Sequence, residues 1–194
     1  MKTQKLLAIA AMVLMTACTA TDSQQGECRI HGTLSSDKWD GQYIFLVPTY
    51  RADSVGVDSA KIAGRKFEFV TTKRNVSDLR LSWRTRFGTQ NLLVVTEPGD
   101  VYVTIDSISH GYGTPQNDSL QAWKTRTENF KRKARALSAA SRNFYAAQDS
   151  VSGDAIKEQL IAARNEYRKA TLRMAKQMEG TPLSEFMYRI YPER

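Results

Sequence analysis

Six basic side chains lie between residues 124 and 135, and they are the densest group in the sequence that could act on another molecule. Ammonium and guanidinium groups bind phosphates and carboxylates, and each charge near an anionic surface contributes about 1 kcal/mol, less at high salt. Two interpretations are open: a solvated helix face, which a run of like charges favours, and a contact site for a protein partner or an anionic envelope component. The six residues are Lys124, Arg126, Lys131, Arg132, Lys133 and Arg135.

Residue types that support catalysis or metal binding are sparse. His31 and His110 are the only histidines, and neither belongs to an HExxH pattern or accompanies paired cysteines. The sequence also has no GxSxG motif and no phosphate-binding glycine loop. Since an enzyme needs groups placed for proton transfer, nucleophilic attack or metal binding, we expect no catalytic residue, no metal site and no cofactor.

Four aromatic residues form a second candidate group: Trp39, Tyr43, Tyr50 and Trp83. Aromatic rings can stack on sugars, but in alternating strands they more often belong to the core. We therefore favour core positions for these four, and a glycan-binding surface would require exposed, coplanar tryptophan rings.

The N-terminus has the pattern of an export signal. Two lysines precede an apolar run over residues 6–15, and small residues stand directly before Cys18. A run of this length is too short to span a bilayer as a resident helix. We expect a cleaved signal over residues 1–17 and a polar tether over residues 18–26.

The segment before Cys18 resembles a lipobox, the cleavage motif of bacterial lipoproteins, because residues 14–18 read Leu-Met-Thr-Ala-Cys. The resemblance implies a diacylglycerol on the Cys18 sulfur, cleavage before this residue and acylation of the new N-terminus. Several acyl chains, at about 0.8 kcal/mol per buried methylene, hold such a protein on a membrane. Because Asp does not follow Cys18, sorting rules of some bacteria imply an outer-membrane location facing the periplasm.

The charge of the chain is concentrated in its C-terminal part. The whole chain carries a net charge of +8. Residues 18–115 hold 11 basic and 11 acidic residues, whereas residues 116–194 hold 15 basic and 9 acidic residues. In an exported protein, this excess argues against nucleic acid and for anionic lipid headgroups, acidic glycans or an acidic protein partner.

Cys28 is the single cysteine that remains when Cys18 carries lipid, so no disulfide is expected. It alternates with Ile30 in a strand-like stretch. This position favours a small buried side chain over a reactive thiol.

The elements that would position these groups fall into two halves with different periods. Between residues 27 and 106, apolar residues alternate in short runs separated by turn signals. This pattern predicts about seven strands and an antiparallel β-sandwich or small barrel over residues 27–115.

Residues 116–194 have the period of helices instead. From Leu120, apolar residues recur at steps of three and four, which predicts a long helix that ends near Val151. We interpret Gly153 as its stop and Asp154 as the cap of a second long helix. The two would pack as an antiparallel hairpin, followed by a short C-terminal helix that begins at a Thr-Pro pair.

Four short motifs follow one another along the chain: DSAK at 58–61, KFEF at 66–69, EPGD at 97–100 and GTPQND at 113–118. Their order and spacing resemble a family of the Bacteroidetes, the domain of unknown function 4369. In that phylum the domain stands at the N-terminus of many exported thioredoxin-like proteins. Their CxxC pair matches no position in this sequence, so no redox residue carries over.

These observations together predict a lipid-anchored module of a bacterial envelope without enzymatic activity. We expect it to contact the membrane through lipidated Cys18, and a protein partner or envelope component through its basic helix. Two alternatives stay open: an accessory subunit of a periplasmic thiol-redox system, which a copurifying CxxC protein would support, and a glycan-binding lipoprotein.

Overall fold

The computed structural model describes residues 26–50, 57–81, 92–106 and 108–192. The predicted export signal over residues 1–17, Cys18, nearly all of the predicted tether, and Trp83 lie outside these ranges.

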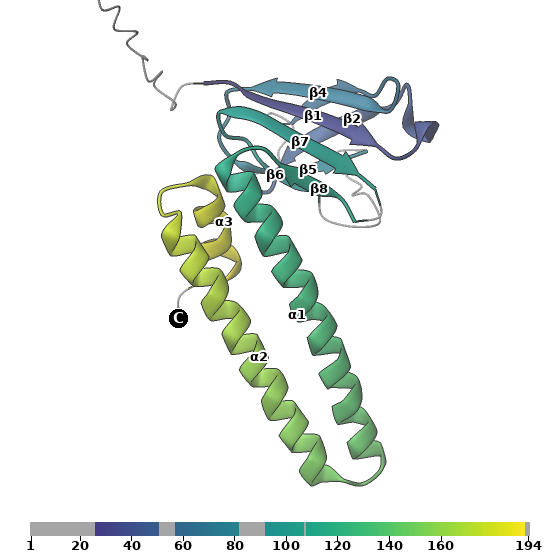
Figure 1. Cartoon of the computed structure of the whole chain (residues 1–194), viewed down its shortest axis with the longest axis vertical. Helices are drawn as coiled ribbons and strands as arrows, with labels where there is room; N and C mark the ends of the chain where they lie inside the picture. The colour runs from purple at the N-terminus through teal and green to yellow at the C-terminus, as the bar shows by residue number, and fades with distance from the viewer. Residues whose placement is uncertain (1–25, 51–56, 82–91, 107, 193–194) are drawn as a thin grey trace, which may run out of the picture.

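Eight strands form two four-stranded sheets in the first half of the chain (Figure 1). The strands are β1 (Cys28–Leu34), β2 (Tyr43–Pro48), β3 (Asp58–Lys61), β4 (Lys66–Thr71), β5 (Val76–Arg80), β6 (Leu93–Val95), β7 (Gly99–Ile105) and β8 (His110–Tyr112). The first sheet has the order β4-β1-β7-β8 and the second the order β3-β2-β5-β6. Among the described strands, all pairs are antiparallel except β1 with β7, which run parallel. The predicted sandwich is confirmed, with this one parallel pair as an addition.

The core between the sheets uses the alternating residues that the sequence predicted. In β1, Cys28 and Ile30 are buried while Arg29 between them is exposed. The Phe67 ring of β4 lies directly over Gly32, where an added Cβ would stand 1.9 Å from the ring. Glycine at position 32 therefore leaves the space that this phenylalanine fills.

Three helices follow the sheets: α1 (Pro115–Ala146), α2 (Ser150–Gln177) and α3 (Pro182–Ile190). Figure 1 shows α1 and α2 running side by side away from the sheets, with α3 folded back near the sheet end of α2. At 1.5 Å per residue, α1 is about 48 Å long. None of the described helices combines the length and apolar character needed to cross a membrane.

The turn between α1 and α2 lies earlier than predicted. The first helix ends at Ala146, not at Val151, and the N-cap of α2 is Asp149. The Asp149 carboxylate accepts a hydrogen bond from the Ser152 N–H at 3.0 Å. Gln148 adopts the left-handed conformation, with φ of 58°, that the prediction assigned to a glycine.

Gly153 and Asp154, predicted as stop and cap, instead lie inside α2. Gly153 is buried against Tyr145 of α1, and an added Cβ would stand 3.1 Å from the ring of that tyrosine. The Tyr145 hydroxyl also donates a hydrogen bond to Asp154. The glycine thus allows close contact between the helices, a role that sequence alone does not distinguish from a helix stop.

A second buried cluster joins the sheets to the helices. Alternate residues of β6 face opposite sides, because Val94 belongs to the core between the sheets while Leu93 and Val95 belong to the second cluster. On the helix side this cluster contains Leu120, Trp123, Ala175, Leu183 and Met187. The β5-β6 part of the second sheet is therefore covered on both faces.

Candidate interaction site on the helical hairpin

The EPGD and GTPQND motifs build a joint between sheet and helix, which we define as residues 95–100 and 113–118. One Glu97 carboxylate oxygen accepts hydrogen bonds from the backbone N–H groups of Gln116 and Asn117, at 2.7 and 3.3 Å. The other accepts one from the Gln116 side chain at 2.9 Å. A carboxylate at this place accepts hydrogen bonds from the free N–H groups at the helix start, and it interacts favourably with the positive end of the helix dipole.

Gly113 allows the chain to pass close to β7 at this joint. Its φ is 113°, and an added Cβ would stand 2.5 Å from the Asp100 carbonyl oxygen. The Gly113 N–H donates to the Asp118 carboxylate at 3.0 Å. Structural roles therefore account for both motifs.

Lys124 differs from the other five basic residues of the predicted site. It is half-buried, and its ammonium donates a hydrogen bond to the Ser109 carbonyl oxygen at 3.1 Å. Burial lowers the pKa of Lys124. This residue connects α1 to the turn between β7 and β8. Its ammonium group is therefore less accessible to a partner than the charged groups of the other five residues.

The other five residues are exposed on more than one side of α1. Lys131 and Arg135 are four positions apart and share one side. Arg126 stands nine positions before Arg135, about two and a half turns, and therefore on the opposite side. Each residue of a helix is rotated by about 100° from the one before it. Arg132 and Lys133 therefore lie on other sides of α1 than Lys131.

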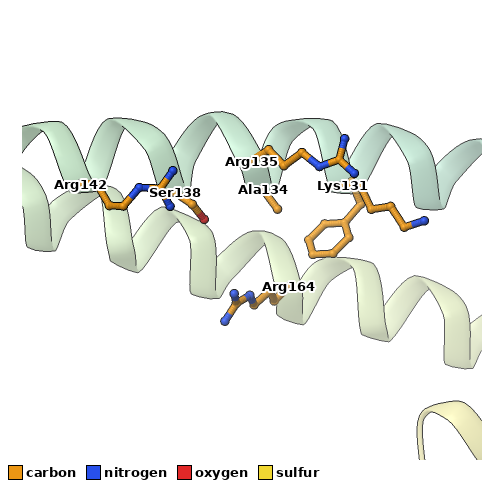
Figure 2. Close-up of a pocket in the computed structure, with 7 residues that line it drawn as sticks. Lys131, Ala134, Arg135, Ser138, Arg142 and Arg164 are labelled. Atoms are coloured by element: carbon orange, nitrogen blue, oxygen red, sulfur yellow. The ribbon is translucent and has the colours of Figure 1, made fainter.

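Lys131 and Arg135 line a groove between α1 and α2 with a volume of about 430 Å³ (Figure 2). Figure 2 shows that the groove has residues of both helices, with Arg164 coming from α2. Four of its seven lining residues are cationic and none is acidic. The lining residues are Phe130, Lys131, Ala134, Arg135, Ser138, Arg142 and Arg164.

Arg142 and Arg164 are groove residues that the sequence analysis missed. The signal for Arg142 was present, because it follows Arg135 by seven positions, about two turns. Arg164 can be placed only when the register of the hairpin is known. That register is visible where Phe130 of α1 stacks on Tyr167 of α2, with ring centres 4.5 Å apart.

The guanidinium groups of the groove are free of carboxylate partners in the part of the chain that the structure describes. Lys131 pairs with Glu128 at 2.8 Å, whereas Arg135, Arg142 and Arg164 form no ion pair there. Guanidinium groups bind carboxylates and phosphates with two parallel hydrogen bonds. The groove can therefore accept an anion.

A second surface crosses the outer face of the first sheet. His31, Tyr102 and Tyr112 stack in a row across β1, β7 and β8, with ring centres 5.2 and 5.6 Å apart. The His31 Nε2 atom also lies 2.8 Å from the Asp100 carboxylate. Tyr102 is therefore the middle ring of the row, with a neighbouring ring on each side, and the row contains no tryptophan.

The predicted aromatic group does not gather at one place. Trp39 is half-buried against the core, as expected. Tyr43 and Tyr50 are exposed, so their assignment to the core is wrong. Tyr43 is the first residue of β2, and Tyr50 lies in the bend after the end of this strand. The Arg189 guanidinium stands 4.1 Å from the Tyr50 ring centre. No described tryptophan offers an exposed ring, since Trp123 is buried.

Cys28 is fully buried in the core. Burial is the main cause that raises the pKa of its thiol. Over the described ranges, no three His, Cys, Asp or Glu side chains lie close enough together to hold a metal ion.

In comparisons with known proteins, residues 28–120 match the family model described as Domain of unknown function (DUF4369). The match covers both sheets and the first six residues of α1, and it confirms the resemblance predicted from the motifs. Searches of the curated proteins and of the solved structures gave no match. The groove lies beyond the matched segment.

Proposed function

Residues 28–120 are a DUF4369 domain, and from this premise we propose that the chain is a lipid-anchored, non-enzymatic module of a bacterial envelope that binds an anionic partner through its helical hairpin. The observation that carries the proposal is the groove between α1 and α2, which has four cations and no acidic residue in its lining.

The charge of the hairpin as a whole supports this function. Helices α1 and α2 together contain 13 basic and 5 acidic residues. Such an excess steers an anionic partner toward the hairpin and speeds its association, most strongly at low ionic strength. The hairpin also extends away from the sheets, so both of its flanks can be approached (Figure 1).

The envelope location is proposed from the N-terminal sequence. The lipobox-like residues 14–18 and the polar segment after them support a lipid anchor at Cys18. An outer-membrane position facing the periplasm follows from the residue after Cys18, as argued above. No contact among the described residues favours the thiol-redox or glycan alternative.

The anchor is tested by labelling cells with an alkyne fatty acid and fractionating their envelopes. We expect the wild-type chain to take up label and to sediment with membranes, and the Cys18→Ala variant to do neither. Equal labelling of both would contradict the anchor.

The binding function is tested by crosslinking in native envelopes. The comparison is between the wild-type chain and a variant in which Lys131, Arg132, Lys133 and Arg135 are all Glu; Lys124 is kept because of its bond to Ser109. We expect an acidic species to crosslink with the wild type, to be displaced by added polyglutamate, and to be lost in the variant. Identical crosslinks in both would contradict a role for the hairpin charge.

A further inference from the structure

We infer that the groove between α1 and α2 is a docking site for an acidic amphipathic helix of a protein partner. This inference rests on the proposed function and names the site and the chemistry of its occupant.

The spacing of the groove cations matches a helix. Lys131, Arg135 and Arg142 are separated by four and seven positions, so they form one stripe along α1 that is about 16 Å long. Carboxylates at the same spacing on a second helix would also form one stripe. Arg164 stands across the groove on α2, so the occupant would meet cations on both sides (Figure 2).

The floor of the groove contains apolar groups, which suits an occupant helix that has an apolar face. Ala134 and half-buried Phe130 line it, and Ile161, three positions before Arg164, is 40% exposed. Beyond Trp123, α1 has no fully buried residue. Two helices alone leave these apolar groups in contact with water, and a third helix in the groove would cover them.

The shape of the site favours a protein helix over a membrane surface. A lipid surface is flat, and it would meet charges that project outward from the hairpin on either side. The opposite side of the hairpin has a smaller recess of about 320 Å³, in which Arg126 and Arg173 are the two cations. The groove is larger and collects four cations around a recess between the two helices. A recess with an apolar floor and a cationic border is complementary to a rod with an apolar stripe and carboxylates beside it.

The test uses the full chain and a peptide probe of about 20 residues, helical and amphipathic, with Glu at spacings of four and seven. Two matched double variants have the same charge change. Arg135→Gln with Arg164→Gln alters the groove. Arg126→Gln with Arg173→Gln alters the opposite flank. Arg126 is nine positions from Arg135 and Arg173 is nine positions from Arg164, which is about two and a half turns and so the opposite side of each helix.

We expect the groove variant to weaken peptide binding at least tenfold, measured by fluorescence anisotropy at physiological salt, since close charge pairs contribute above 1.4 kcal/mol. The flank variant should weaken it less than about twofold. A peptide with Gln in place of Glu should not bind. A further variant, Ser138→Glu, keeps every cation but places a carboxylate in the groove, four positions before Arg142, and should also abolish binding.

Equal weakening by both double variants would overturn the docking site while leaving the proposed function in place, because binding would then depend on net charge alone. Groove-dependent binding to phosphatidylglycerol vesicles, without peptide binding, would overturn the protein occupant. Binding of neither the peptide, polyglutamate nor the vesicles would overturn the proposed function as well. Circular dichroism of each variant checks that the helices are intact.

Discussion

Asn117 of α1 and Val95 of β6 are joined by two hydrogen bonds that imitate the pairing of a neighbouring strand. The Val95 N–H donates to the Asn117 side-chain oxygen at 2.9 Å, and the Asn117 amide donates to the Val95 carbonyl at 2.8 Å. Asn117 is 1% exposed. Because β6 is an edge strand, this side chain satisfies backbone groups that no strand reaches.

Replacing Asn117 by Ala should lower the free energy of unfolding by about 2–4 kcal/mol, because two buried backbone groups lose their partner. Urea denaturation followed by circular dichroism measures this. Asn129→Ala, at an exposed position of the same helix, is the control and should change stability by less than about 0.5 kcal/mol. A similar small effect of Asn117→Ala would show that the joint is not held by this pair.

Asp149→Ala should destabilise the hairpin tip at neutral pH. Hydrogen bonds from the Ser152 hydroxyl and N–H hold the pKa of Asp149 below its ordinary value of 3.8. The stabilisation is therefore present above about pH 4 and is lost as pH falls through the lowered pKa. Thermal unfolding should separate variant and wild type at pH 7, and the difference should shrink as the pH falls through the lowered pKa. Asp149→Asn keeps a capping oxygen and should retain most of the stability without this pH dependence.

Cys28 should react with a maleimide only when the protein unfolds. Burial blocks access to its sulfur and raises its pKa, which lowers the thiolate fraction. In a Cys18→Ala background, the labelling rate should rise with denaturant along the unfolding curve. A matched protein with Cys28→Ala and Ser35→Cys, at an exposed position, should label rapidly without denaturant. Equal native rates would mean that Cys28 is accessible.

Gly32→Ala should destabilise the sandwich by about 1–3 kcal/mol, because the new methyl group would displace the Phe67 ring. Phe67→Leu should also be destabilising on its own. The two changes together should cost clearly less than their sum, since a smaller side chain at 67 leaves room at 32. Additive costs in denaturant unfolding would contradict this packing.

The sequence predicted those parts of the fold that depend on local pattern. Alternation correctly placed Cys28 and Ile30 in the core, and the Thr-Pro pair correctly began α3. The turn at residues 147–149 was missed because Gln148, which is not a usual residue for a left-handed conformation, adopts it. Contacts across the hairpin decide that turn, and a single sequence does not reveal them.

The candidate site was only partly predicted, again because a single sequence does not reveal the contacts between elements. Charge density marked Lys131 and Arg135, and period alone could have added Arg142. It could not separate Lys124, whose burial depends on the β7–β8 turn, or add Arg164 from the other helix. Residues that act together across elements become visible only when the register between the elements is known.

The parallel pairing of β1 with β7 gives the chain a short mechanical path. It places Cys28 beside Gly99. The Gly99 N–H donates a hydrogen bond to the Glu27 carbonyl oxygen at 3.0 Å, and an added Cβ at Gly99 would stand 3.2 Å from the Thr114 methyl group at the start of α1. In a tethered protein that holds a partner by its hairpin, tension would enter before β1 and leave through α1. The load would cross one corner of the first sheet, and most of the sandwich would not be stretched.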